Sequence, residues 1–416
     1  MTLDKFPDAD PSITLDFLKS KKLDPRISFT RASGGGAVGT GSGNVNGEVY
    51  TFQENVPRLT DKGLLIEEAR TNYQFNSEAF AVNTGWRIKS DYTRGANTTE
   101  PAPDGSNTAC EFFEVTGGGT YNGVEAATQY QVTPSSGRLT ISVYNKPINC
   151  DTFYIGSSST AQNHANCTSI VNNTWTFNTS FVESAKAEPI GNGWYRMSAT
   201  MIVPTSSQWY RPLFSSQMFP ESDTPDSSQG CTLWGAQLEE GSFVSSYIPN
   251  TGTSGEVTRA ADLAAITGTD FSSWYSQGTG TLVSGWTSPD TKQFSVPAMI
   301  KSGTAKNTPG IFVYTYSGAL RDVVGSVTGS QVFWQNAVTP NTPLKLAITY
   351  DASTQSTAYN GNTPKSVAIT TAVPTMIRMN MGDHYIVNDR YSNGYLSHIS
   401  YYPTHVSDDA LEALTS

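Results

Sequence analysis

Short runs of alternating apolar and polar residues, separated by turns, constrain this 416-residue chain more than any other feature. In residues 195–201 the odd-numbered positions are apolar and the even-numbered ones are polar, so we expect a β-strand whose odd face lies in a core. Asn192 and Gly193, just before this run, predict a tight turn. No window sustains a long apolar period of 3.6 residues, so the sequence predicts an all-β protein.

The composition agrees with many strands and turns. The chain has 36 glycines and 22 prolines, 11% aromatic residues and 15% charged residues. A chain of this length exceeds one hydrophobic core, and we expect three units.

Charge and hydropathy exclude several partners. The formal net charge of −10 argues against nucleic acid, because phosphate binding needs clustered lysine and arginine. No apolar run of 18 residues occurs, so we expect no membrane insertion. Asp4, Asp8, Asp10 and Asp16 interrupt any apolar segment that could serve as a signal peptide.

Residues 231–250, CTLWGAQLEEGSFVSSYIPN, read as the last strand of one β-domain, an acidic turn and an extended run. Simple alternation places Trp234 and Leu238 on one face, so we expect Trp234 to be a core anchor. Glu239 and Glu240 follow the strand, where we expect a solvated acidic corner rather than a catalytic pair.

Six motifs resemble a set found in virion proteins of tailed bacteriophages that carry a carbohydrate-binding-module-like jelly roll. They are Phe29-Thr30-Arg31-Ala32-Ser33, residues 63–72 (GLLIEEARTN), Gly193-Trp194-Tyr195-Arg196, residues 233–241 (LWGAQLEEG), Tyr247-Ile248-Pro249 and Thr258-Arg259-Ala260-Ala261-Asp262. Together they cover about residues 11–262. They are framework motifs, so the resemblance implies an architecture rather than a ligand.

The expected organisation has three parts. Residues 1–80 would form an extended attachment and oligomerisation segment, because its short strands near 13–17, 27–30 and 64–66 need partner strands or neighbouring chains. The resemblance to fibre proteins implies a homo-oligomer, a trimer, joined to other virion proteins through this segment. Residues 81–252 would form the carbohydrate-binding-module-like β-sandwich. The apolar-free run before Glu256 predicts an exposed hinge.

Residues 253–416 resemble a laminin-G-like or concanavalin-like jelly roll. The long run 344–351, followed by residues 356–361 ending in Asn-Gly, matches a strand and hairpin of that family. Residues 394–402 match its closing strand, and Ser407 would cap a short terminal helix whose first turn carries Asp408 and Asp409. The fold class is therefore two jelly-roll sandwiches behind an N-terminal segment.

The motifs of common enzymes are absent. No Gly-x-Ser-x-Gly occurs, the four histidines lack metal-ligand spacing, and Glu67 and Glu68 should point to opposite faces of a strand. The four cysteines also lack metal spacing, so we expect buried thiols, with a Cys150–Cys167 disulfide as the alternative. We expect no enzymatic activity.

Aromatic side chains are the better functional candidates, because sugar rings stack on tryptophan and tyrosine. The candidate glycan contacts are Trp209, Tyr210, Trp274, Tyr275, Tyr385 and Tyr391. The alternative for each is core or interdomain packing. Asp383, Asn388 and Asp389 could hold Ca²⁺ through oxygen ligands, with a polar loop as the alternative; no other cofactor is expected.

The sequence thus predicts a phage tail fibre or capsid-attached appendage that binds host-cell glycans. It would fold in the host cytoplasm and lie on the virion surface. Two rival functions remain at this point: a structural decoration or tail-joining protein without ligand, and a polysaccharide depolymerase.

Overall fold

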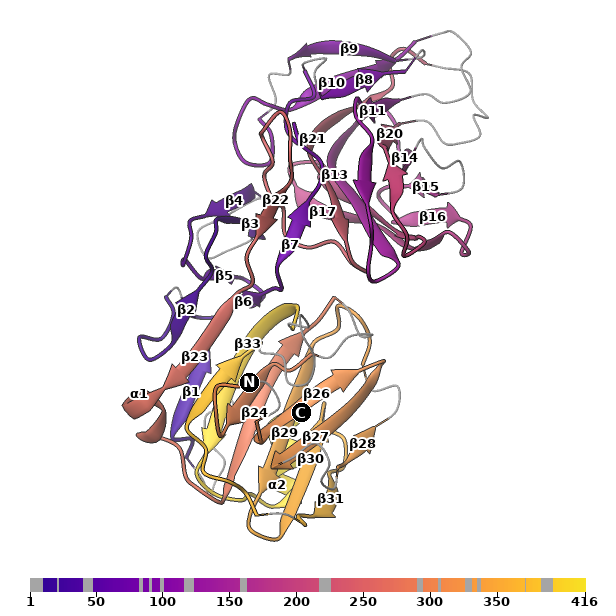
Figure 1. The fold of residues 1–416 in the computed structure, drawn as a ribbon. Helices are drawn as coiled ribbons and strands as arrows, with labels where there is room; N and C mark the ends of the chain where they lie inside the picture. Colours follow the sequence, from indigo (N-terminus) through magenta and orange to yellow (C-terminus); the bar gives the residue numbers. More distant parts are fainter. Residues whose placement is uncertain are drawn as a thin grey trace. The chain divides into compact units, whose positions relative to one another are not determined.

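The computed structural model describes residues 10–20, 22–39, 48–81, 85–89, 92–97, 101–115, 123–157, 163–216, 226–289, 295–305, 308–325, 331–334, 338–370, 372–382 and 392–416. The chain divides into two compact units. Unit 1 contains residues 1–32, 54–69 and 260–416, and unit 2 contains residues 33–53 and 70–259. Strands make up almost all of the regular structure, which confirms the all-β prediction (Figure 1).

Unit 1 is a sandwich of two sheets. Among the described residues, the larger sheet has eight strands, in the order β31 (Lys365–Ala368), β30 (Thr354–Tyr359), β29 (Leu344–Tyr350), β24 (Gly280–Thr287), β33 (Gly394–Tyr402), β6 (Gly63–Ile66) and β5 (Arg58–Thr60), with β1 (Ile13–Asp16) also paired to β33. The other has seven, in the order β2 (Ser28–Thr30), β23 (Leu263–Thr267), β32 (Arg378–Met381), β25 (Ala298–Lys301), β26 (Gly310–Tyr316), β27 (Ala319–Gly325) and β28 (Phe333–Trp334).

Four strands of unit 1 come from the N-terminal segment. β1 and β6 both pair with β33, β2 pairs with β23, and β5 pairs with β6. Figure 1 shows these indigo strands beside orange and yellow strands from the C-terminal part of the chain. The expected short strands therefore exist, but their partners lie in the same chain. The predicted boundaries at residues 80 and 252 do not coincide with the observed units. The reason is that β1, β2 and β6 hydrogen-bond to the C-terminal strands β33 and β23.

A single apolar core lies between the two sheets of unit 1. It combines side chains from the N-terminal strands, such as Ile13 and Leu64, with C-terminal ones such as Ile348 and Tyr401. The terminal helix α2 (Asp408–Thr415) packs Leu411 and Leu414 against the outer face of the larger sheet. The Ser407 hydroxyl accepts a hydrogen bond from the Ala410 amide, so the predicted N-cap is confirmed.

Unit 2 is a second sandwich. We name its two six-stranded sheets, counted over the described residues, after their central strands. The β13 sheet has the order β17 (Val182–Gly191), β18 (Trp194–Ile202), β13 (Arg138–Ile148), β21 (Gly230–Glu240), β10 (Cys110–Glu114) and β9 (Tyr92–Asn97). The β14 sheet has the order β16 (Thr174–Phe177), β15 (His164–Ser169), β14 (Phe153–Ser157), β20 (Pro212–Ser215), β11 (Val124–Ala126) and β8 (Trp86–Ile88).

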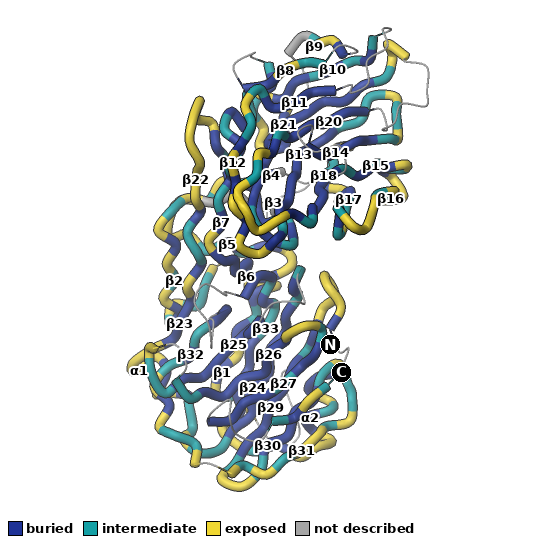
Figure 2. The backbone as a smooth tube through the Cα atoms, turned by 45° about the vertical axis from the view of Figure 1, so that its right-hand side comes forward, coloured by how far each residue is buried: buried dark blue, intermediate teal, exposed yellow. Residues whose placement is uncertain are grey.

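Smaller elements complete both units. Unit 2 also contains the strand pairs β12 (Tyr130–Val132) with β19 (Gln208–Tyr210), β22 (Val257–Arg259) with β7 (Arg70–Asn72), and β3 (Gly35–Gly39) with β4 (Glu48–Phe52). Unit 1 contains the short helix α1 (Gly268–Ser272). Figure 2 shows the central strands of each sandwich as buried and many connecting loops as exposed.

The alternation in residues 195–201 is confirmed in β18. Met197, Ala199 and Met201 are buried in the core between the two sheets, and Tyr195 packs against that core. Asn192 and Gly193 have φ angles of 50° and 77°, as the two central residues of a hairpin turn between β17 and β18 require.

A β-bulge at Gly235 changes the expected faces of β21. Gly235 has φ 62°, and the register with β13 shifts between Ser142 and Tyr144. Trp234 is buried beside Tyr144 and Tyr247 on the outer face of the β13 sheet, whereas Leu238 lies in the core between the sheets. The prediction that Trp234 is a core anchor is confirmed, but its shared face with Leu238 is wrong, since the bulge adds one residue to the strand.

Candidate functional site

The aromatic pair at residues 209–210 divides between surface and core. Trp209 is 51% exposed, whereas Tyr210 is 1% exposed and packs in the core of unit 2. Burial raises the pKa of Tyr210 above its ordinary value. Tyr210 is therefore a core residue, and its prediction as a glycan contact is wrong. Trp209 keeps an accessible ring.

The second aromatic pair closes one end of the unit 1 core. Trp274 is 5% exposed and lies 5.2 Å from Tyr401 between ring centroids. Tyr275 is half-buried and stacks on Phe271 at 4.8 Å, and burial raises its pKa to about 12. Because α1 turns the chain back, residues i, i+3 and i+4 meet on one side. Trp274 is a packing residue, contrary to its prediction as a sugar platform.

The remaining predicted site residues lie outside the described part of the chain. These are the aromatic candidates Tyr385 and Tyr391 and the calcium candidates Asp383, Asn388 and Asp389. In the ranges that the structure does describe, no group of three or more His, Cys, Asp or Glu side chains is placed to hold a metal ion. None of the described helices has the length and apolar character needed to span a membrane.

Trp209 lies in β19 of the two-stranded pair β12–β19, just before the chain enters β20 of the β14 sheet. Tyr210 and Phe214 point into the core, so alternation directs Trp209, Arg211 and Leu213 to the opposite side. The strand pair β12–β19 holds Trp209 opposite Gln131. The Ser157 hydroxyl accepts a hydrogen bond of 3.0 Å from the Arg211 amide, which fixes the chain between β19 and β20. A rigid strand thus presents the Trp209 ring.

Glu125 is the polar centre of this face. Its side chain is 2% exposed, and its neighbours Val124 and Ala126 point into the core. The Oε1 atom lies 3.4 Å from Arg87 Nη2, 3.2 Å from Lys89 Nζ and 3.4 Å from Arg211 Nη1. These cations come from two distant parts of the chain: Arg87 lies in β8 and Lys89 follows it, while Arg211 precedes β20. A buried carboxylate with several cationic partners holds them in place.

An aromatic pair continues the same face across β14 and β15. Tyr154 stacks on His164 with ring centroids 5.4 Å apart, and Tyr154 is 4% exposed. Gly156 pairs with His164, and a Cβ atom at Gly156 would lie 2.6 Å from the His164 Cβ. Only glycine therefore allows β15 to approach this closely at residues 163–164. We call this surface, formed by Arg87, Lys89, Glu125, Trp209 and Arg211 with the Tyr154–His164 pair, the Glu125 face.

Glu239 and Glu240, the two carboxylates of the motif at residues 233–241, are hydrogen-bonded to neighbouring residues of unit 2. Glu239 is fully buried and accepts hydrogen bonds from the Ser245 amide at 2.9 Å, the Ser245 hydroxyl at 2.6 Å and Gln237 Nε2 at 2.7 Å. Its expected place at a solvated corner is wrong, because the run after β21 folds back and covers it. Glu240 instead accepts from Ser135 and Ser136 near the surface.

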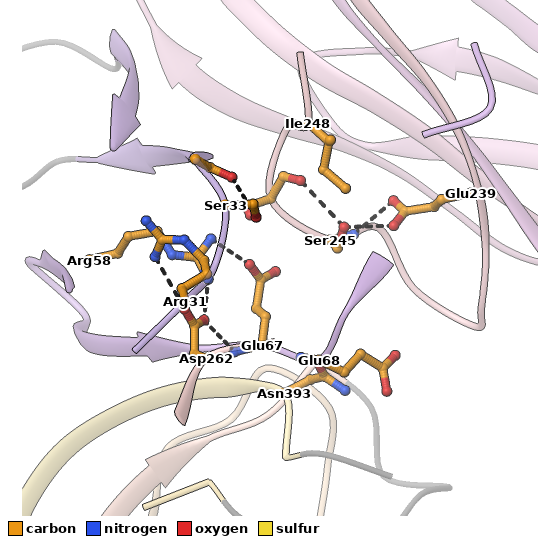
Figure 3. A network of polar contacts seen from close by, with 12 residues as sticks. Arg31, Ser33, Arg58, Glu67, Glu68, Glu239, Ser245, Ile248, Asp262 and Asn393 are labelled. Atoms are coloured by element: carbon orange, nitrogen blue, oxygen red, sulfur yellow. Dashed lines mark hydrogen bonds and ion pairs between the residues drawn. The ribbon is translucent and has the colours of Figure 1, made fainter. Parts of the chain in front are cut away.

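Three of the motifs meet in a buried ion cluster of unit 1 (Figure 3). Arg31 Nη1 lies 3.1 Å from Asp262 Oδ1, Arg58 Nη1 lies 2.7 Å from Glu67 Oε2, and Arg58 also bonds Asp262. These four side chains are at most 6% exposed. Two arginines and two carboxylates balance one another, so the cluster joins strands rather than binding substrate.

All four cysteines are free. Cys110, Cys167 and Cys231 are buried and Cys150 is half-buried, so the alternative Cys150–Cys167 disulfide does not form. Burial raises the pKa of Cys110 to about 11 and that of Cys167 to about 12, which makes both thiols poor nucleophiles.

Sequence reasoning found Trp209 but missed Arg87, Lys89, Glu125 and Arg211. Arg211 lies two positions after Trp209, and in an extended chain this spacing places two side chains on the same side. This spacing could have indicated Arg211 as a neighbour of Trp209. Glu125, Arg87 and Lys89 had no such signal, because strand pairing rather than proximity in the chain brings them together.

Together these features define a two-unit β-sandwich protein with an aromatic and charged sheet face. No protein-family model and no curated protein matches the chain. Among solved structures, it is similar to the CBM40 of a Ruminococcus gnavus sialidase bound to α2,3-sialyllactose, with 14% identity, 35% of this chain and 88% of that chain covered, and a TM-score of 0.31.

Two further structures overlap smaller shares of their own chains. The NanB sialidase of Streptococcus pneumoniae is 15% identical, with 36% of this chain and 26% of that chain covered and a TM-score of 0.28. The receptor-binding domain of botulinum neurotoxin mosaic serotype C/D is 10% identical, with 37% and 39% covered and a TM-score of 0.28. Each match covers about a third of this chain, and none assigns it a ligand.

Proposed function

We propose that the chain is a non-enzymatic virion protein of a tailed bacteriophage, a tail fibre or capsid appendage that binds host cell-surface glycans. The Glu125 face carries this proposal. A half-exposed tryptophan beside fixed hydrogen-bonding side chains is the combination that binds a pyranose, because the ring stacks on the indole while its hydroxyls bond to the polar groups. The phage origin and the virion surface location rest on the motif resemblance.

The carboxylates support a binding function rather than hydrolysis. A glycosidase needs two carboxyl groups that flank one bond across a cleft. In the described part of the chain, Glu67, Glu125 and Glu239 are each buried and engaged by basic or hydroxyl groups. A depolymerase would therefore need other carboxylates than these.

A glycan array with the full-length chain separates the three candidate functions. We expect binding to a subset of bacterial surface glycans without release of reducing sugar, and Trp209→Ala should abolish the binding. Release of reducing sugar would favour a depolymerase. Absence of binding to a broad array of host glycans would favour the structural role.

The proposed trimer and its attachment through residues 1–80 rest on the resemblance to fibre proteins. The described strands of that segment pair within the chain, so contacts between subunits would use other surfaces of it. Light scattering should give three times the chain mass of 44.8 kDa. A monomer mass would contradict the trimer without affecting the glycan site.

A further inference from the structure

Basic side chains outnumber carboxylates at the centre of the Glu125 face. Among the described residues, its ion pairs join three cations, Arg87, Lys89 and Arg211, to the single carboxylate of Glu125. One carboxylate neutralises one cation, so these four groups keep a charge of +2. The whole chain has a formal net charge of −10, which makes this local sign an exception.

The excess charge is open to solvent. The side chains of Arg87, Lys89 and Arg211 are 47%, 35% and 22% exposed, whereas Glu125 is 2% exposed. The buried Glu125 carboxylate therefore pairs with the three cationic groups, which remain partly accessible to solvent. Its burial also keeps the carboxylate itself away from an approaching ligand.

The distance from Trp209 to the cations suits one sugar residue. Trp209 lies in β19 and Arg211 lies between β19 and β20, two positions further along the chain. In an extended backbone this spacing separates their Cα atoms by about 7 Å. A pyranose stacked on the indole would place a ring substituent over Arg211. An acidic substituent there would meet guanidinium donors, which bind carboxylate and sulfate well.

We infer that the Glu125 face selects anionic glycans, whose sugar residues carry a carboxylate or a sulfate group. This inference rests on the proposed glycan-binding function and specifies its ligand class. A local charge of +2 suits isolated anionic substituents. The acidic chain as a whole repels a dense polyanion such as nucleic acid.

The test compares neutral, uronic-acid, sialylated and sulfated oligosaccharides by calorimetry with the full-length chain. We expect the anionic ligands to bind at least about tenfold more tightly than neutral ones of the same size, with a preference that weakens as salt rises. The uronic-acid and sialylated arms report a carboxylate, and the sulfated arm reports a sulfate.

The double variant Arg87→Gln/Lys89→Gln is the main test. It leaves Arg211 against Glu125, so the buried carboxylate keeps a counter-charge and the unit should fold, which a thermal melt checks. It should lose about five- to tenfold in affinity for anionic ligands and little for neutral ones. The control Lys186→Gln removes an exposed charge from β17 of the other sheet and should change neither affinity.

The outcomes separate the inference from the proposed function. Equal binding of neutral and anionic glycans, lost in Trp209→Ala but unchanged in the double variant, would overturn the anionic selectivity and leave glycan binding intact. Absence of binding to every oligosaccharide would overturn both.

Discussion

At the scale of single residues, Trp234 and Trp209 differ in burial, so their removal should have different effects on stability. Trp234 is 1% exposed, packs 4.8 Å from Tyr247 between ring centroids, and donates a hydrogen bond from Nε1 to the Thr108 hydroxyl. Trp209 is half-exposed on the Glu125 face. Burial, rather than residue type, decides which one the fold depends on.

Trp234→Ala should lower the free energy of unfolding by about 3–5 kcal/mol, because it leaves a large cavity among buried aromatic side chains. Trp209→Ala should change it by less than about 1 kcal/mol while it abolishes glycan binding. Urea unfolding followed by circular dichroism measures both. A Trp234→Ala protein as stable as the parent would contradict the packing described here.

A buried carboxyl group should make the stability of unit 1 depend on pH. Asp322 lies between the sheets, where it accepts hydrogen bonds from Thr357 and from the Val332 amide. Burial raises its pKa from an ordinary value of 3.8 to about 6. The folded protein therefore holds a proton that the unfolded chain releases between these pH values, so the free energy of unfolding falls as pH rises through this window.

Between pH 4 and pH 7, ionisation of Asp322 should lower the free energy of unfolding by up to about 3 kcal/mol. Asp322→Asn should remove this pH-dependent loss. Unfolding free energies at pH 4, 5, 6 and 7 for parent and variant give the comparison. Asp351 is the control, since hydrogen bonds from the Ser353 and Thr354 amides lower its pKa to about 2. Asp351→Asn should alter the profile only below about pH 4. Parallel profiles for parent and Asp322→Asn would refute the prediction.

At the scale of elements, the bulge in β21 determines which β21 side chains lie between the two sheets and which lie on the outer face of the β13 sheet. Gly235 has φ 62°, and a Cβ atom there would lie 2.8 Å from Tyr144 Cδ2. The bulge turns Trp234 outward onto Tyr144 and Tyr247 and leaves Leu238 between the sheets. The segment after the strand then covers that outer face.

Gly235→Ala should therefore destabilise the protein by about 2–4 kcal/mol, through backbone strain and the clash with Tyr144. Gly255→Ala is a matched control, because Gly255 has φ 85° but open space around its Cβ position. It should cost only the strain of about 1–2 kcal/mol. Equal losses in the two variants would show that the Tyr144 contact does not matter.

At the scale of the whole molecule, the chain passes between the units four times, after residues 32, 53, 69 and 259. A cut in the exposed run 251–256 therefore does not release an independent C-terminal domain. It separates β1, β2, β5 and β6 from β33 and β23, which complete the unit 1 sheets. Residues 251–256 are exposed, as expected, but the chain does not leave unit 2 there. The next strand, β22, hydrogen-bonds to β7 of the same unit.

A chain ending at residue 259 should keep unit 2 folded while residues 10–32 and 54–69 become sensitive to protease. Limited proteolysis followed by mass spectrometry should locate cuts in these ranges, which the full-length chain protects. The fragment 260–416 should lack a cooperative thermal transition, since four strands are missing. A fragment that melts as cooperatively as the full chain would show that the N-terminal strands are dispensable.

Local sequence patterns were sufficient to predict the local features of the fold. Alternation predicted β18, Asn192-Gly193 predicted its hairpin, and Ser407 predicted the cap of α2, because each depends on residues near one another in the chain. The same reasoning found Trp209 as an exposed aromatic residue but could not distinguish it from Tyr210 and Trp274, whose burial depends on distant partners.

The remaining features depend on contacts between residues that are far apart in the chain. Ile13 pairs with Tyr401 and Ile66 with Gly394, at separations that no local pattern encodes. The Glu125 face joins Arg87, Glu125 and Arg211, which belong to three segments aligned by strand register. Side-chain alternation is a local property of the backbone, whereas strand partners, register and bulges follow from how the whole chain buries its apolar faces.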